Sequence, residues 1–206
     1  MFAALVFMAA LGSAYPDPIA SAMERYRAVE TYQVTLKSSH GDDVEHIRYF
    51  FRKPGFVRME FIRPHQGAVL VYNPTARKVR LWPFGLGFMA LTLSPDSRLI
   101  QSPRGQRVDR SDVAALFENV KALQQHGKME IVGEEPVAEQ RALHFTVSGT
   151  DEFTVENVHR YDLWLEDSTL FPVKVESRDV RNQLIETVLM EDVKINPPLQ
   201  ESLFNP

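Results

Sequence analysis

Closely spaced turn signals constrain the fold of this chain more than any other feature. From Tyr32 onward, apolar and polar residues alternate, and turn-forming residues recur at 40–43, 53–55, 63–65 and 73–75. Such short connections join antiparallel neighbours, because parallel strands require crossovers of about a dozen residues or more. The first half is therefore predicted to be a meander. Its strands are expected at about 32–39, 44–52, 57–63, 67–73 and 77–83.

The same alternation returns in the second half of the chain. Turn signals at 134–136, 149–151, 166–168 and 179–182 separate five further runs. The corresponding strands are expected at about 128–134, 141–149, 158–166, 171–179 and 183–195. Together the two halves predict about ten antiparallel strands.

Side-chain alternation also assigns faces within the predicted strands. Successive residues of a strand point to opposite faces of the sheet. Tyr49 and Phe51 therefore share one face, and Phe50 lies on the other. By the same argument the apolar residues of 57–61 lie opposite the charged residues between them. The sequence does not decide which face is concave, because a register slip of one residue exchanges the two faces.

Two amphipathic helices are expected beside the sheet. Asp17 is a favourable N-cap, and Pro18 suits the first helical position, where its missing N–H costs nothing. A second helix is predicted over 111–126, with Asp109 or Ser111 as its cap and Gly127 as its C-terminal stop. Each helix carries one apolar stripe, so each is expected to pack one face on the sheet.

A single sheet of about ten strands must twist and curl, and a curled sheet has a concave side. Only two helices and one apolar insertion are available to cover that side. The fold class is therefore α+β and mostly antiparallel β. The patterning leaves two interiors open, a lined apolar cavity and a fully packed core.

Residues 84–100 interrupt the strand pattern. They are mostly apolar, Gly85 and Gly87 loosen the backbone, and Pro95 ends any regular element. An apolar segment of this kind is not expected to remain an ordinary exposed loop. It caps a cavity, adds a strand, or touches a membrane or a partner.

Charge and cysteine content exclude several functional classes. The formal charge is −4, so the positive surface of a nucleic-acid-binding protein is not expected. The chain contains no cysteine, which excludes disulfides, thiolate metal sites and cysteine nucleophiles. Nucleic acid is therefore not an expected partner.

The sequence shows no recognisable catalytic pattern. Its six histidines are scattered singly, without the one-turn spacing of a helical metal site. There is no Gly-x-Ser-x-Gly elbow and no glycine-rich phosphate loop. No metal, no cofactor and no enzymatic activity are expected.

The N-terminus is typical of an export signal. Phe2–Leu11 is an uncharged apolar run too short to span a bilayer, and small residues at 12–14 follow it. We expect residues 1–14 to be a signal peptide and 15–206 to form a single domain. No Lys or Arg precedes the run, so a buried N-terminal helix is the alternative interpretation. Because there is no cysteine to acylate, the exported protein is expected to be soluble, periplasmic and not lipid-anchored.

The segment 49–84 and the C-terminal end carry a resemblance to a known family. Arg52-Lys53-Pro54 precedes an aromatic strand and an aliphatic strand, and Tyr72-Asn73-Pro74 forms the next turn. The last strand runs to Asn196, and the chain closes near Leu203-Phe204. These motifs resemble the periplasmic lipoprotein carriers of the LolA family and their superfamily, which includes the receptor LolB and the sigma-factor regulator RseB.

The resemblance implies a curled half-barrel whose concave apolar face is lidded by helices and receives acyl chains. In the carriers, an arginine before the motif proline bonds to the lid, and Lys53, with Arg52 beside it, occupies that position here. Residues 84–100 and the 111–126 helix are expected to form the lid. The expected cavity residues are Val57, Met59, Phe61, Leu70, Val79, Phe88, Leu116 and Phe117.

The resemblance favours an exported carrier that holds the acyl chains of a lipoprotein or lipid and moves them across the periplasm. Its expected partners are an inner-membrane donor and an outer-membrane acceptor, and the carrier is expected to be a monomer. The main alternative is an RseB-like envelope-stress sensor that binds lipid and a membrane partner. An enzyme with unrecognised chemistry and a purely structural envelope protein are further alternatives.

Overall fold

The computed structural model describes residues 17–102 and 105–206. The signal expected at residues 1–14, and residue 15 where the mature chain is expected to begin, lie outside the described residues. The single domain expected over 15–206 stays a prediction. No helix within the described part of the chain is long and apolar enough to cross a membrane.

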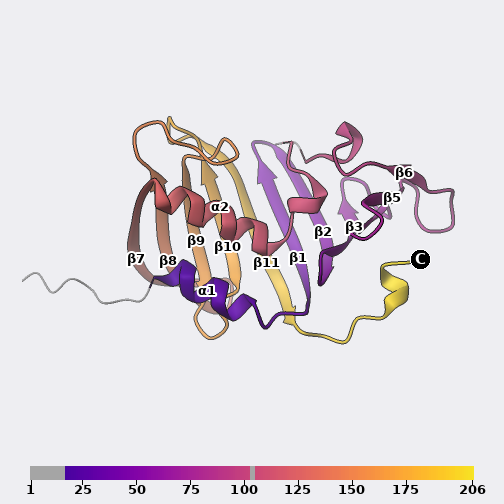
Figure 1. Ribbon diagram of the computed structural model, residues 1–206, viewed down its shortest axis with the longest axis horizontal. Helices are drawn as coiled ribbons and strands as arrows, with labels where there is room; N and C mark the ends of the chain where they lie inside the picture. Colours follow the sequence, from indigo (N-terminus) through magenta and orange to yellow (C-terminus); the bar gives the residue numbers. More distant parts are fainter. Residues whose placement is uncertain (1–16, 103–104) are drawn as a thin grey trace, which may run out of the picture.

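One helix precedes each of two runs of consecutive strands along the described chain, as shown in Figure 1. In chain order they are α1 (Pro18–Tyr26), β1 (Thr31–His40), β2 (Asp43–Arg52), β3 (Phe56–Arg63), β4 (Val69–Asn73), β5 (Lys78–Trp82), β6 (Leu91–Leu93), the 3-10 helices η1 (Arg98–Ile100) and η2 (Val108–Arg110), α2 (Val113–Gln125), β7 (Gly127–Val137), β8 (Gln140–Gly149), β9 (Arg160–Glu166), β10 (Pro172–Arg178), β11 (Leu184–Ile195) and η3 (Glu201–Leu203).

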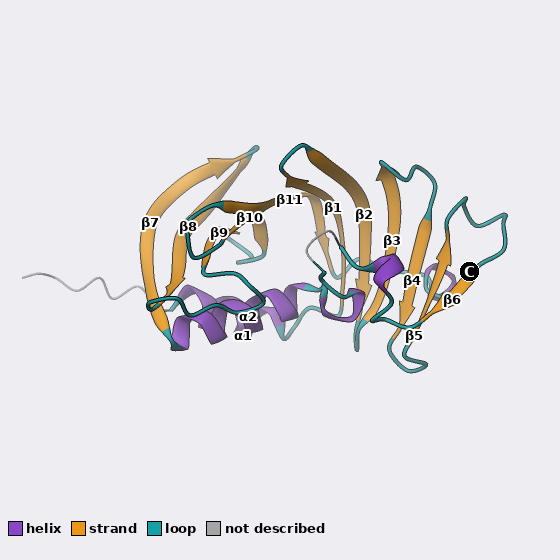
Figure 2. Cartoon of the chain, turned by 90° about the horizontal axis from the view of Figure 1, so that it is seen from above, coloured by secondary structure: helices purple, strands orange, loops and turns teal. Residues whose placement is uncertain are grey.

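The strands form one antiparallel sheet of two meanders. Its order is β6-β5-β4-β3-β2-β1-β11-β10-β9-β8-β7, so β1 and β11 join the N-terminal meander to the C-terminal one. We call this β1–β11 pairing the seam; it places Leu36 opposite Met190. The sheet curls into an arch, and its edges β6 and β7 stay apart (Figure 2). The predicted α+β half-barrel is confirmed.

The strand prediction missed β6. All ten expected strands are present, and the eleventh is the three-residue strand Leu91–Leu93, which pairs with β5. A strand of three residues inside an apolar run is too short for alternation to identify it. For this reason the sequence predicts strand formation only as one of three outcomes for 84–100.

Asn196 closes one end of the seam. Its side-chain oxygen accepts the backbone N–H groups of Glu30 and Thr31, at 2.7 and 3.2 Å, and its amide donates to the carbonyl of Ala28 at 3.1 Å. One side chain thus satisfies three backbone groups between α1 and the start of β1. This contact explains the strand ending at an asparagine.

Helix α1 begins as the sequence predicts. The Asp17 carboxylate accepts the N–H groups of Ile19 and Ala20, at 3.0 and 3.2 Å, and Pro18 is the first helical residue. The second carboxylate oxygen accepts a hydrogen bond from Lys121 of α2 at 2.9 Å. The cap therefore also ties the two helices together.

Helix α2 has a different cap from either predicted residue. Asp112 accepts the N–H of Ala115 at 3.0 Å, whereas Asp109 lies within η2. Ser111 donates its hydroxyl to the carbonyl of Val108 at 2.8 Å. The 3-10 turn before the helix displaces the cap by one residue from Ser111, which periodicity alone does not show.

Asp112→Ala is expected to lower the free energy of unfolding by about 1 kcal/mol, because the N–H of Ala115 loses its acceptor. Asp112→Asn keeps a capping oxygen and is expected to retain most of that stability. Urea denaturation of both variants measures the difference. Equal stability of the alanine variant and the wild type would contradict the assigned cap.

The C-terminal segment crosses the convex face of the sheet. Phe204 is buried there with Phe50, Val71 and Trp82. The guanidinium of Arg52 lies over the rings of Phe56 and Phe204, 4.6 and 4.8 Å from their centroids. The convex side of the N-terminal meander is thus covered by the chain itself, which leaves the concave side as the candidate site.

Candidate functional site

A cavity of about 530 Å³ lies on the concave face of the sheet. Its floor comes from β1–β5 of one meander and from β9–β11 of the other. Its cover comes from residues 99–102 and 105–113 and from α2, which cross the open side of the arch (Figure 2). The cavity therefore spans the seam.

The pleat of each strand sends alternate side chains into the cavity. On β1 these are Val34, Leu36 and Ser38, and on β2 they are Ile47 and Tyr49. Phe50, the residue after Tyr49, lies in the convex cluster. The floor is mostly aliphatic, so the sheet offers an apolar ligand a surface from which water is easily displaced.

Aromatic rings fill the space beneath α1 and α2. Tyr32 stacks on Phe51 with ring centroids 4.9 Å apart and on Tyr49 at 5.8 Å, and Tyr26 meets Phe117 of α2 edge to face at 6.0 Å. Burial raises the pKa of Tyr32 and of Tyr49 above the ordinary tyrosine value. Both phenols therefore stay protonated at neutral pH.

Two of these tyrosines hold the cover on the floor. The N–H of Val113 donates to the Tyr32 hydroxyl at 3.3 Å. The hydroxyls of Tyr49 and Ser111 are 3.2 Å apart and share a hydrogen bond. These two contacts position the start of α2 above β1 and β2.

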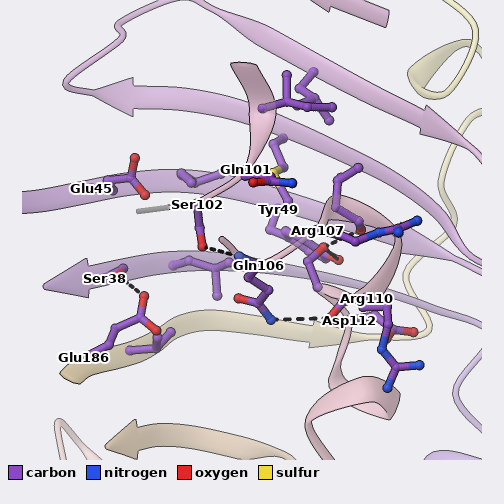
Figure 3. A pocket seen from close by; sticks show the side chains of 18 of the residues that line it. Ser38, Glu45, Tyr49, Gln101, Ser102, Gln106, Arg107, Arg110, Asp112 and Glu186 are labelled. Carbon is purple, nitrogen blue, oxygen red and sulfur yellow. Dashed lines mark hydrogen bonds between the residues drawn. The ribbon is translucent and has the colours of Figure 1, made fainter. Parts of the chain in front are cut away.

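Polar groups gather at the end of the cavity near the β1–β2 turn. Ser38 donates to the carboxylate of Glu186 at 2.5 Å, and Glu45 lies close enough to feel the charge of Glu186 (Figure 3). His65 also lines this end. A second polar set, which includes Gln106, Arg107 and Arg110, belongs to the cover itself. The cavity is thus amphiphilic, with apolar walls between polar ends.

The Glu45 side chain is expected to make stability fall as the pH rises. Burial, and then the charge of Glu186, raise its pKa above 4.5; Asp43 raises the pKa further and His65 opposes it. The folded state thus favours the protonated form, so stability is lost as the pH climbs from below 4.5 through the raised pKa. Glu45→Gln should therefore raise the melting temperature more at pH 7 than at pH 4.

The exposed carboxylate of Asp42 in the neighbouring turn provides the control. Asp42→Asn should leave the pH dependence of the melting temperature close to that of the wild type. An equal rise in melting temperature from Glu45→Gln at both pH values would show that ionisation of the Glu45 carboxyl group does not cost stability.

The structure brings together half of the residues that the sequence analysis nominated for the cavity. Met59, Phe61, Leu70 and Leu116 line it. Val57, Val79 and Phe117 are instead part of the packed core around it and are at most 2% exposed. Phe88 lies away from the cavity wall and is 63% exposed. Alternation selected the correct face of the strands but could not separate lining residues from packed ones.

The nominated latch residues point to different sides of the sheet. Lys53 donates to the carbonyl of Arg27 at the end of α1, at 2.6 Å, and pairs with Glu30 at 3.1 Å. Arg52 stacks between aromatic rings on the convex face, as described above. Lys53 is therefore the one of the two that contacts the end of α1.

The cover differs in part from the segment expected from the sequence. Residues 84–90 form a largely exposed loop, and 91–93 extend the sheet. Of the segment 84–100, only Leu99 and Ile100 line the cavity. Sequence analysis missed the cover residues 101–102 and 105–110, which lie between the two expected lid segments. They are mostly polar and show no periodicity that could identify them.

A family comparison agrees with this architecture. The sequence model for the MucB/RseB N-terminal domain matches residues 90–206. The chain belongs to the MucB/RseB N-terminal domain family. This confirms the resemblance to the LolA, LolB and RseB superfamily of lipoprotein-binding proteins. None of the curated protein sequences matches the chain significantly.

Solved structures with low sequence identity share the fold. An uncharacterized conserved protein from Thermus thermophilus has 12% identity and a TM-score of 0.59 over 92% of this chain and 94% of its own. Lipoprotein LppX of Mycobacterium tuberculosis has 9% identity and a TM-score of 0.56, with 89% and 95% covered. The Pseudomonas aeruginosa MucA/MucB complex has 17% identity and a TM-score of 0.52, with 91% of this chain and 60% of the matched chain covered.

Proposed function

We propose that this protein binds the acyl chain of a lipoprotein or lipid in the concave cavity. The observation that carries the proposal is a cavity of about 530 Å³ with apolar walls from both meanders, covered by α2 and by residues 99–102 and 105–113. That volume falls within the roughly 300–1,000 Å³ of typical ligand pockets. Each buried methylene contributes about 0.8 kcal/mol, so an acyl chain gains most of its affinity from such walls.

We further propose that the protein is exported and carries its ligand across the periplasm, without a lipid anchor and as a monomer. The apolar run at residues 2–11 supports export, and the covered cavity supports a role in holding a ligand in transit. A carrier must also release its cargo. A cover held by few hydrogen bonds suits release, because opening it costs little and competes with ligand binding.

Photo-crosslinking tests the proposal. A photoreactive amino acid at position 61 would lie on the cavity wall, and irradiation in living cells would capture what the cavity holds. Lipoprotein adducts, identified by mass spectrometry, are the expected result, and position 62 on the same strand is the matched control. A folded, exported protein that yields no acylated adduct at position 61 would contradict the proposal.

A sensor role is the second candidate, and the MucB/RseB family match favours it. The Pseudomonas structure contains MucB together with MucA, so this fold accepts a protein partner there. The matched chain in that complex is longer than this one, since the alignment covers 60% of it. A membrane protein captured by surface crosslinks and released on lipid binding would favour the sensor over the carrier.

A further inference from the structure

The loop between β5 and β6 concentrates exposed apolar side chains. Of the eleven large apolar side chains exposed in the described residues, five lie in it or at the residue that follows it: Phe84, Leu86, Phe88 and Met89 in the loop, and Leu91 at the start of β6. Met89 is 87% exposed and Phe84 75%. Single exposed apolar residues are ordinary, but five within eight positions mark a contact surface. We call residues 84–91 the apolar loop.

The apolar loop projects from the sheet edge. Gly85 has a φ of +97°, and a Cβ there would lie 3.4 Å from the carbonyl oxygen of Gly67, so the base of the loop rests on the β3–β4 turn. The rings of Phe84 and Phe88 meet each other edge to face at 6.2 Å. They pack on one another at the surface and add little to the core.

The charges around the apolar loop differ from those of the whole chain. Residues 83–95 contain no charged side chain, although the protein carries a formal charge of −4. Exposed Arg63 is the last residue of β3, before the adjoining β3–β4 turn, and exposed Arg98 begins η1 after β6, with Asp96 as the neighbouring acid. The apolar tip is thus flanked by cations, which suits the interface of a bilayer with anionic lipids.

Apolar residues on either side of the apolar loop line the cavity. Pro83, at the base of the loop, lines it. Leu99, beyond β6, also lines it and is 75% exposed. The chain segment that carries the loop thus also contributes to the cavity wall.

We propose that the apolar loop docks the protein on a lipid bilayer, with Phe84, Phe88 and Met89 inserted among the headgroups. This docking surface lies outside the acyl-chain site and does not require the cavity to be filled. At about 150–250 Å² per fully buried aromatic side chain, the partly exposed loop offers less than the roughly 800 Å² per partner of a stable protein interface. A bilayer needs no complementary surface, so a small tip is sufficient there.

Vesicle co-sedimentation tests the docking surface with the full chain. Vesicles of phosphatidylethanolamine and phosphatidylglycerol should pellet the wild type, and those of phosphatidylcholine alone should pellet less of it. The double variant Phe84→Asp with Phe88→Asp should bind at least about tenfold more weakly. Leu184→Asp is the matched control, because Leu184 is 51% exposed on β11 outside the loop, and it should bind like the wild type.

A fluorescence measurement locates the contact independently. Phe88→Trp should be quenched by vesicles of brominated lipid, and Leu184→Trp should not; the native Trp82 and Trp164 are buried and give the same background in both. Absence of wild-type binding, or equal quenching of both variants, would overturn the proposal. Self-association of the wild type that the double variant loses, without vesicle binding, would assign the loop to a second copy and overturn it too.

The same assays separate this surface from the cavity. The double loop variant should still bind a fluorescent fatty acid in solution. Phe61→Glu, which alters the cavity wall, should still pellet with vesicles. Loss of vesicle binding therefore tests the docking surface, and loss of fatty-acid binding tests the cavity, each without the other.

Discussion

Phe61→Glu is expected to weaken binding of a fluorescent fatty acid by about a hundredfold or more. Phe61 lies on the cavity wall, and a carboxylate there removes apolar contact with the ligand. Loss of contact with about four methylene groups, at about 0.8 kcal/mol each, amounts to about 3 kcal/mol, or roughly a hundredfold. A desolvated carboxylate beside the ligand weakens binding further. Titration with the probe measures the effect.

Ile62→Glu is the matched control for that substitution. Ile62 is the next residue on β3, it is 43% exposed, and it is absent from the cavity wall. The same charge placed there should leave affinity for the fatty acid within about twofold. Circular dichroism establishes that both variants are folded. Equal affinity of the Phe61 variant and the wild type would show that the acyl chain does not use this cavity.

Phe117→Ala is expected to lower the free energy of unfolding by about 3–5 kcal/mol, because it leaves a void in the core under α2. Phe117 is 1% exposed and its ring meets Tyr26 of α1 at 6.0 Å. The loss should weaken the attachment of both helices to the sheet. Urea denaturation, with the slope checked against the wild type, measures it.

Glu118→Ala is the neighbouring control on the same helix. Its carboxylate is exposed and pairs with Arg110 at 3.2 Å, an ion pair of the kind that contributes little in water. That substitution should change the free energy of unfolding by no more than about 0.5 kcal/mol. A similarly small effect at Phe117 would mean that α2 rests loosely on the sheet.

The fold could be read from the sequence because its determinants are local. Short turns fixed the antiparallel order within each meander, and alternation placed Tyr49 and Phe50 on opposite faces. The Asp17 cap likewise depends on residues next to it in the chain. Curling followed from the number of strands. None of these inferences required a contact between distant residues.

The site was predicted only in part because it depends on distant contacts. Met59 and Leu116 line the cavity as expected, whereas Val79 is fully buried in the core. Strand alternation gives the face of a residue, but its depth depends on what packs above it. The cover is held at Ser111 and Val113 by the hydroxyls of Tyr49 and Tyr32, and no sequence pattern links those residues.

The seam has a consequence for how the protein reaches its native state. Lys37 and Glu191 meet across it although they are 154 positions apart, so the joining of the meanders is a highly non-local step. Chains dominated by such pairings fold slowly, since the loop must close before the contacts form. Until β11 has paired, each meander exposes its concave apolar face and is prone to aggregate. A ligand that binds only the joined form would stabilise it by mass action, so cargo supply and folding yield are expected to rise together.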